Sequence, residues 1–296
     1  MDKQRAPLAF ARPSARVASE IRRKLSAGCD SLACMTTTAE QAELLRSLHV
    51  PGDPLIVTNV WDAITAKIVA GAPGVKALAT ASHAVSFAQG VEDGEGLTVE
   101  QALATAKLVV SAVDIPVSVD FEKGYAPDAS GVQRNVERLI SVGAAGLNIE
   151  DSIGQAKAPQ FDLDTAVSRV AAARAAGDAT GVPIVINARV DTLAGGGEWA
   201  DAITRANAYL GAGADCVFVL GLGDEARVAR ALAEINGKVS VISNPTSVPL
   251  RKLAELGVSR VSFGPGIMGL TLAHLRATAT LLTALGDYPG ELGFSY

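Results

Sequence analysis

Residues 141–151, Ser-Val-Gly-Ala-Ala-Gly-Leu-Asn-Ile-Glu-Asp, contain a junction between a helix and a buried strand. Gly143 is placed to end the helix, because glycine readily adopts the left-handed conformation that closes helices. The short run Gly146–Glu150 follows and ends on carboxylates. Residues 212–215 and 255–259 repeat the same pattern of glycine before an apolar run. Mostly apolar runs of this kind are typical of strands buried on both faces in a parallel sheet.

The unit recurs along the chain. Eight short runs, each closed by a polar residue or glycine, are predicted as strands: 55–58, 77–80, 116–120, 146–150, 183–188, 215–220, 238–243 and 260–263. Helices are predicted before and between them: 39–49, 98–113, 132–142, 164–177, 199–210, 224–235 and 249–256. Eight strand–helix units in ~250 residues indicate an α/β fold with one (β/α)8 TIM barrel. A doubly wound open sheet is the alternative, although no Gly-x-Gly-x-x-Gly follows the first strand.

We expect two segments of different character. The barrel is predicted to occupy residues 37–296, and residues 1–36 form an N-terminal extension, an irregular or helical arm. The extension is rich in Arg, Ser and Ala and is interrupted by Pro7 and Pro13. An organelle transit peptide, or a true start at Met35, are the alternative interpretations of this extension.

Composition excludes several classes of function. The net charge of −5 and the absence of long Lys/Arg runs argue against a nucleic-acid partner. No run of 18 apolar residues and no secretory signal is present, so neither a membrane protein nor an exported one is expected. The three cysteines, Cys29, Cys34 and Cys216, form no CxxC pair, which predicts a reducing compartment, the cytoplasm. Cys216 itself opens an apolar strand and is expected in the core.

Polar residues cluster where the predicted strands end, which is where (β/α)8 barrels place their active sites. Asp120 and Glu122 stand two apart on an extended segment, so both side chains point the same way, and Glu150 closes the next strand. Converging carboxylates repel one another, and a divalent metal relieves the repulsion. Oxygen ligands without a His or Cys cluster favour Mg2+ or Mn2+ over Zn2+.

Asn187 and Arg189 end the fifth strand. Arg189 is suited to hold a carboxylate opposite the metal, because guanidinium binds carboxylates in a bidentate manner. A metal and an arginine together would hold a small 2-oxo acid and stabilise its enolate.

Structural roles compete with these functional ones. Asp62, Asp151 and Asp191 are alternatively helix N-caps, and His83, at the end of the second strand, is alternatively a hydrogen-bonded structural residue. The run Phe263-Gly-Pro-Gly is either a phosphate-binding turn or a turn that the backbone requires.

Five ordered segments resemble the isocitrate lyase/phosphoenolpyruvate mutase superfamily, and the similarity runs from about residue 38 to about residue 290. They are Val57–Ala63, Gly90–Glu95, Val119–Tyr125, Gly146–Asp151 and Ile186–Asp191. The resemblance implies a barrel whose last helix is exchanged with a neighbouring subunit in a homodimer or homotetramer. It also implies Mg2+-dependent making or breaking of a C–C or P–C bond beside a 2-oxo or 2-hydroxy carboxylate.

The resemblance further implies roles for individual residues. Asp120 matches the direct metal ligand, and Asp93, Glu122 and Glu150 match acidic residues that hold the metal largely through water. Arg189 matches the clamp for the substrate carboxylate. Ala81, Ser82 and His83 match the loop that receives the substrate. We also expect Asn187 to bind substrate, and Glu122 and His83 to join Arg189 as catalytic residues.

The chain departs from the family pattern in one loop. Lyases of this family carry Lys-Lys/Arg-Cys-Gly-His after the fourth strand, whereas residues 150–160 here contain no Cys or His. This disfavours isocitrate lyase activity. The phosphonate branch has a specific Asn or Thr there, and this loop offers only Ser152, Gln155, Lys157 and Gln160. Glu122 also replaces the usual Asp of the mutase, and His83 stands where a small residue is common.

Three functions therefore remain open. The first is Mg2+-dependent cleavage or formation of a C–C bond in a small 2-oxo or 2-hydroxy carboxylate through an enolate, as in a retro-aldol lyase or a decarboxylase. The second is P–C chemistry on phosphonopyruvate or a carboxyphosphonate. The third is a barrel that binds a metabolite with its metal but does not turn it over.

Overall fold

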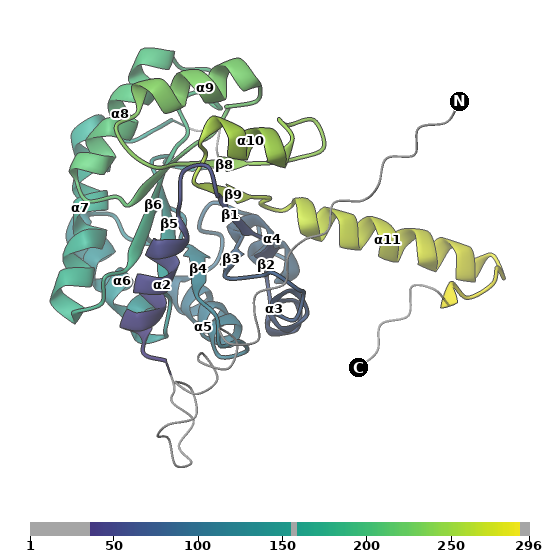
Figure 1. The fold of residues 1–296 in the computed structure, drawn as a ribbon. Helices are drawn as coiled ribbons and strands as arrows, with labels where there is room; N and C mark the ends of the chain where they lie inside the picture. Colours follow the sequence, from purple (N-terminus) through teal and green to yellow (C-terminus); the bar gives the residue numbers. More distant parts are fainter. Residues whose placement is uncertain (1–35, 155–158, 291–296) are drawn as a thin grey trace, which may run out of the picture. The chain divides into compact units, whose positions relative to one another are not determined.

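The computed structural model describes residues 36–154 and 159–290. Figure 1 shows strands surrounded by helices, as the sequence predicts. The strands are β1 Leu55–Val57, β2 Asn59–Val60, β3 Leu78–Thr80, β4 Val117–Asp120, β5 Gly146–Glu150, β6 Val185–Val190, β7 Cys216–Val219, β8 Val239–Ile242 and β9 Arg260–Ser262. The helices are α2 Thr38–Leu48, α3 Ala63–Ala70, α4 Ser82–Ala88, α5 Val99–Val110, α6 Ala129–Ser141, α7 Leu163–Thr180, α8 Trp199–Gly211, α9 Glu225–Glu234, α10 Leu250–Leu256 and α11 Gly266–Thr283.

The sheet closes into a ring through its first strand. Every pairing is parallel, and the order runs from β2 through β3 to β9 and then to β1. β1 pairs with β9, whereas β2 pairs with β3, and only Thr58 separates β1 from β2. The predicted strand 55–58 is thus one extended segment shared between two neighbours. This confirms the (β/α)8 barrel and rules out the open doubly wound sheet.

Side-chain caps start most of the helices. Each of these residues accepts a hydrogen bond from a backbone N–H in the first turn, which satisfies a donor that the helix leaves free. The caps are Thr37, Asp62, Thr98, Asp128, Asp162 and Asp224. The cap interpretation of Asp62 is therefore confirmed.

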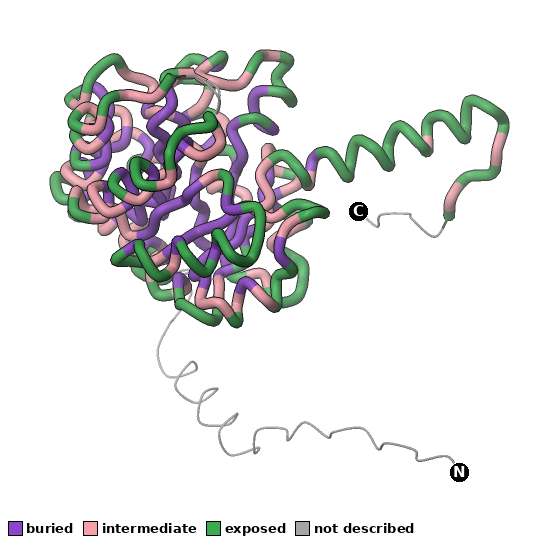
Figure 2. The backbone as a smooth tube through the Cα atoms, turned by 90° about the horizontal axis from the view of Figure 1, so that it is seen from above, coloured by how far each residue is buried: buried purple, intermediate pink, exposed green. Residues whose placement is uncertain are grey.

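The interior of the ring changes character along its axis. At the start of the strands, α2 packs Leu45 against an apolar cluster that includes Leu55, Val57 and Val185. The next level is polar and wholly buried, with Asn187 on β6 and Arg260 on β9. Figure 2 shows the buried segments inside the ring of exposed helix faces. The floor of the barrel is therefore filled, and the site lies at the other end of the strands.

α11 is the helix that the barrel covers least. Within it Met268 is buried, but residues 269–277 are exposed, and Leu270 and Leu275 are 69% and 62% accessible. Leucines are rarely left this open along one helix unless another surface covers them. Among the described residues, no helix combines the length and apolar character needed to cross a membrane.

Two smaller expectations have clear outcomes. Cys216 is buried and unpaired in the core, as predicted. The phosphate-binding interpretation of residues 263–266 is wrong, because the N–H groups of Phe263 and Gly264 both donate to Asn59 Oδ1 at 2.8 Å. Gly264 has φ of +54°, so the backbone turn explains the glycine. The expectation for residues 1–36 falls almost entirely outside the described residues.

Candidate active site

A pocket of about 210 Å3 opens at the C-terminal ends of the strands. Predicted site residues Ala81, Ser82, His83, Asp93, Asp120 and Arg189 line it, with Asn59, Thr80, Asn148, Phe218, Leu220, Ile242, Ser262, Gly264 and Pro265. The volume suits a small molecule of a few heavy atoms. Asn187, expected to bind substrate, does not line the pocket: it is 1% exposed and donates to Asn148 Oδ1 on the neighbouring strand.

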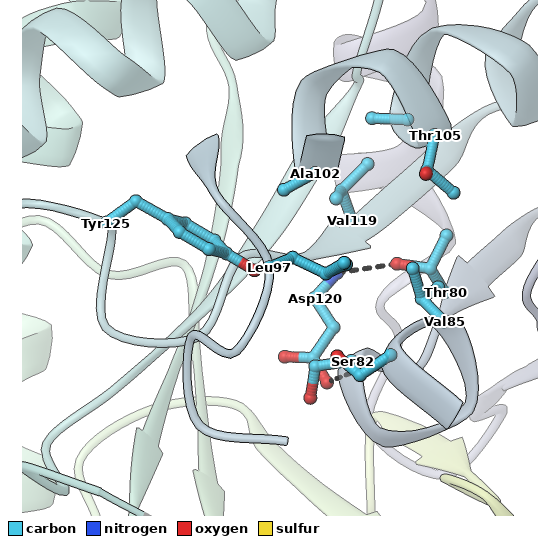
Figure 3. Close-up of a pocket in the computed structure, with 11 residues that line it drawn as sticks. Thr80, Ser82, Val85, Leu97, Ala102, Thr105, Val119, Asp120 and Tyr125 are labelled. Carbon is cyan, nitrogen blue, oxygen red and sulfur yellow. Dashed lines mark hydrogen bonds between the residues drawn. The ribbon is translucent and has the colours of Figure 1, made fainter. Parts of the chain in front are cut away.

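Asp120 is held from two sides at the end of β4. Its backbone N–H donates to Thr80 Oγ1 at 2.8 Å, and its Oδ2 accepts from the Ser82 backbone N–H at 2.9 Å. These contacts leave Oδ1 without a partner among the described residues. Burial raises the pKa of Asp120, and the nearby Arg189 charge opposes that shift. Figure 3 shows Asp120 beside a second, much smaller cavity, lined also by Leu97, Val119 and Tyr125.

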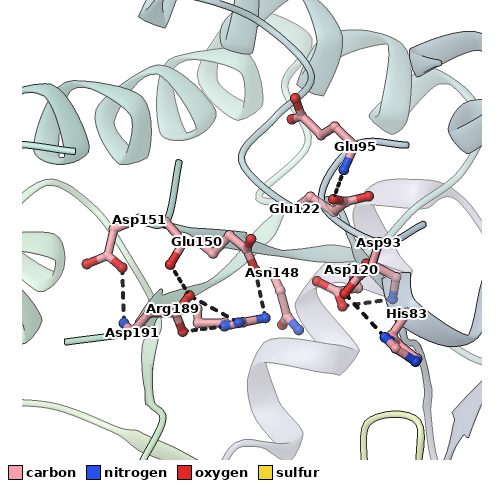
Figure 4. Close-up of polar contacts among 12 residues, drawn as sticks. His83, Asp93, Glu95, Asp120, Glu122, Asn148, Glu150, Asp151, Arg189 and Asp191 are labelled. Carbon is pink, nitrogen blue, oxygen red and sulfur yellow. Dashed lines mark hydrogen bonds and ion pairs between the residues drawn. The ribbon is translucent and has the colours of Figure 1, made fainter. Parts of the chain in front are cut away.

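Arg189 lies between two carboxylates. Its Nη1 is 2.6 Å from Glu150 Oε2, and its Nε and Nη2 contact the two oxygens of Asp191 at 2.6 and 3.0 Å (Figure 4). Burial raises the pKa of Glu150 well above its usual value, and Arg189 opposes that effect. Arg189 is therefore fixed in position while still lining the pocket.

Further hydrogen bonds hold Asp191 and its neighbour Asp151 in position. Asp191 accepts from Ser152 Oγ at 2.6 Å, and its backbone N–H donates to Asp151 Oδ1 at 3.0 Å. Asp151 Oδ2 accepts from Tyr209 at 2.7 Å. The N-cap interpretations of Asp151 and Asp191 are therefore wrong, because both side chains support the position of Arg189 rather than a helix.

Glu122 lies behind the pocket wall and not in its lining. It accepts hydrogen bonds from the Glu95 backbone N–H and, at 2.6 Å, from the Tyr125 hydroxyl. Glu122, Glu95 and Tyr125 all have positive φ, between 47° and 65°. Non-glycine residues adopt this conformation when surrounding contacts hold them there, often beside a functional site. Burial raises the pKa of Glu122 to about 7.

His83 and Asp93 meet at the rim of the pocket. His83 Nδ1 is 3.6 Å from Asp93 Oδ2, and the imidazole is more than half exposed. The other oxygen of Asp93, Oδ1, is buried without a hydrogen-bond partner. A buried carboxylate oxygen of this kind requires a ligand, an ion or a water.

The oxygen atoms fit a magnesium-type ion with few protein ligands. Within residues 36–154 and 159–290, no three His, Cys, Asp or Glu side chains lie close enough together to hold a metal directly. Two carboxylate oxygens are nonetheless free, Asp120 Oδ1 and Asp93 Oδ1, and both residues line the pocket. Mg2+ usually keeps several waters and takes one or two carboxylates. Glu122 and Glu150 do not line the pocket, and the water-mediated role that the resemblance implies for them stays a prediction.

Several supporting residues were not predicted. Thr80 is the last residue of β3, and a polar residue at a strand end is a signal that could have found it. Tyr209 lies near the C-terminal end of α8 and contacts Asp151, which is 58 positions away along the chain. No local pattern reveals such a long-range contact.

Comparisons with known proteins agree with this arrangement. The family model for phosphoenolpyruvate phosphomutase matches residues 45–283. The 2-methylisocitrate lyase of Salmonella typhimurium is 30% identical over 257 residues, covering 81% of this chain and 86% of that protein. The phosphoenolpyruvate phosphomutase of Streptomyces hygroscopicus is 30% identical and covers 81% and 79%.

Solved structures give the same result. A 2,3-dimethylmalate lyase aligns with a TM-score of 0.76 at 25% identity, covering 88% of this chain and 89% of that one. Relatives in this superfamily are enzymes that act on small carboxylates. Fold, site and similarity lead to one conclusion: the chain belongs to the isocitrate lyase/phosphoenolpyruvate mutase superfamily.

Proposed function

We propose that the protein is a divalent-metal-dependent lyase that cleaves a C–C bond in a small 2-oxo or 2-hydroxy carboxylate through an enolate. The observation that supports this most directly is the pairing of Asp120 and Arg189 across one pocket of about 210 Å3. A carboxylate with a free oxygen and an immobilised guanidinium are complementary to a metal-bound 2-oxo acid.

Arg189 would bind the substrate carboxylate. Glu150 and Asp191 hold its guanidinium before the substrate arrives, so little ordering cost remains for binding. Its charge also stabilises the oxyanion that develops when the C–C bond breaks. Asp120 and Asp93 would hold Mg2+ or Mn2+, which would supply Lewis-acid stabilisation of the developing enolate.

The C–C bond that breaks is the one attached to the carbon that becomes the nucleophilic carbon of the enolate. In a 2-oxo dicarboxylate the pair of electrons from the C3–C4 bond moves into the enolate, and carbon dioxide leaves. The enolate carbon then takes one proton. We assign His83 as the donor of that proton, because it lines the pocket at its open rim.

The exposed face of α11 supports a homo-oligomer. Leu270 and Leu275 are exposed to solvent to the degree usual for charged surface side chains, although the helix is apolar. We propose that α11 packs on a second copy of the chain, in a dimer or tetramer. Size-exclusion chromatography with light scattering tests this directly.

Oxalate, a mimic of the enolate, is the best first probe. Isothermal titration calorimetry is expected to show binding that needs Mg2+ and that disappears in Asp120→Ala. The Asp178→Ala variant, an exposed carboxylate at the far end of α7, is the matched control and should bind as the wild type does. Retained binding in Asp120→Ala would overturn the metal assignment.

A substrate panel then separates the chemistries. Release of a carbonyl product or carbon dioxide from 2-oxo and 2-hydroxy di- and tricarboxylates supports the lyase. Release of phosphate from phosphonopyruvate with Mg2+ present would instead favour P–C chemistry. Oxalate binding without turnover on either panel would favour a metabolite-binding barrel.

A further inference from the structure

Arg260 is a cation in the middle of the barrel that the function described above leaves without a role. It is 1% exposed and lies on the inward face of β9. Its neighbours are small or polar: Ser240 is its pairing partner on the adjacent strand β8, and Ser118 lies across the ring. Barrel interiors are ordinarily filled by branched apolar side chains, so a guanidinium there needs an explanation.

The charge of Arg260 is not paired. Its Nη1 donates to Ser118 Oγ at 3.2 Å, its Nη2 lies 3.5 Å from Asn148 Oδ1, and its Nε is buried without a partner. No described carboxylate forms an ion pair with it. Burial lowers the pKa of Arg260 to about 10, so the side chain remains a cation at neutral pH. Such a residue destabilises the fold, which points to a role outside stability.

Arg260 determines which way the Asn148 amide faces. Asn148 Oδ1 accepts from Asn187 Nδ2 at 2.9 Å and faces Arg260 Nη2. The Asn148–Asn187 pair alone would tolerate the opposite orientation, because Asn187 Oδ1 is buried and unpartnered. Arginine has no acceptor, so the reversed amide would set its Nδ2 against a second donor. Arg260 therefore selects the orientation with Oδ1 inward.

The consequence is a donor at the floor of the pocket. Asn148 lines the pocket, and its Nδ2 has no partner among the described residues. In register, Asn148 lies between Asp120 on β4 and Asn187 on β6. Figure 4 shows Asn148 with Asp120 and Arg189 on the neighbouring strands. An oxygen of a ligand held between Asp120 and Arg189 would lie above this amide.

We propose that Asn148 Nδ2 donates a hydrogen bond to a carboxylate or enolate oxygen of the substrate, and that Arg260 is a positioning residue which acts through Asn148. The inference rests on the proposed function, because it assumes an oxyanionic ligand beside Asp120. It adds a specificity element: a ligand without an acceptor oxygen at this point is rejected, since the amide would be left without a partner.

The test is oxalate binding with saturating Mg2+, measured by calorimetry. Asn148→Ala is expected to weaken binding about 10-fold, since one hydrogen bond to a charged group is lost. Asn148→Asp, which replaces the donor by an anion of the same shape, is expected to weaken it about 100-fold or more. Asn236→Asp is the matched control, because Asn236 is exposed and remote from the pocket.

A double-mutant cycle distinguishes positioning from general support of the fold. Arg260→Met is expected to weaken oxalate about 10-fold while its Tm does not fall, because an unpaired buried charge has been removed. The double variant Arg260→Met/Asn148→Ala should bind no more weakly than Asn148→Ala alone. Arg251→Met, at an exposed arginine, controls for the loss of charge.

The outcomes separate the two proposals. A wild-type protein that does not bind oxalate with Mg2+ overturns the proposed function and this inference with it. Normal binding in the wild type together with unchanged affinity in Asn148→Ala and Asn148→Asp overturns the inference alone. Strictly additive losses in the double variant would show that Arg260 does not act through Asn148. Should Arg260→Met fail to fold, the two Asn148 variants still decide whether the donor exists.

Discussion

His49 is expected to make the fold sensitive to mild acid. The side chain is 2% exposed, its Nδ1 lies 2.8 Å from the Leu45 carbonyl oxygen, and its Nε2 is buried without a partner. Burial, aided by the positive charge of Arg260, lowers the pKa of His49 from 6.5 to about 4. The unfolded chain therefore binds this proton more readily than the folded one. Stability is complete above about pH 6.5 and is lost as the pH falls from there towards 4.

The magnitude follows from the two pKa values. A shift of one unit corresponds to about 1.4 kcal/mol, so the whole effect is roughly 3 kcal/mol, and about 2 kcal/mol of it is lost between pH 7 and pH 5. Urea unfolding, followed by tryptophan fluorescence at both pH values, measures that loss. His49→Gln should remove about 2 kcal/mol of the pH dependence. The exposed His274→Gln should keep all of it. Equal pH dependence in the wild type and His49→Gln would refute the reasoning.

Three further changes have definite expected results. Arg189→Lys loses the bidentate contact with Asp191 and should weaken oxalate 10- to 100-fold in calorimetry; wild-type affinity would contradict the assignment. Gly146→Ala sets a Cβ 2.7 Å from Leu45 Cδ2 and should cost about 1–3 kcal/mol in urea unfolding, whereas Gly211→Ala, in open space at the end of α8, should stabilise by about 0.5–1 kcal/mol. Leu275→Asp should reduce the mass seen by light scattering, and an unchanged mass would exclude α11 from the interface.

Much of the fold could be predicted from the sequence, because each buried barrel strand has a recognisable local pattern. The runs predicted at 116–120, 146–150 and 183–188 are buried strands in the structure, and a short apolar run with a polar end was enough to find them. The split of the first strand at Thr58 was not readable, because it depends on which neighbours pair with each half. Pairing between distant segments is a tertiary property.

The site was predicted less completely than the fold. Strand ends correctly nominated Asp120 and Arg189 as pocket residues. The strand-end rule also nominated Asn187, which is buried below the pocket surface. The rule does not specify how far along the barrel axis a side chain lies. A residue two positions earlier on a strand points the same way but sits one layer deeper. Asn148 was missed because it lies inside β5, two residues before Glu150, and the rule considered only residues at strand ends.

The plug that α2 places at the start of the strands has a kinetic consequence. Leu45 packs at one end of the barrel and Arg260 fills the level above it, so among the described residues the interior is closed on the side away from the pocket. Under the proposed function, the fragments of a cleavage would then leave by the route the substrate used. The fragment held by Asp120 and Arg189 would depart last. Product inhibition should therefore be competitive for that fragment and noncompetitive for the one released first.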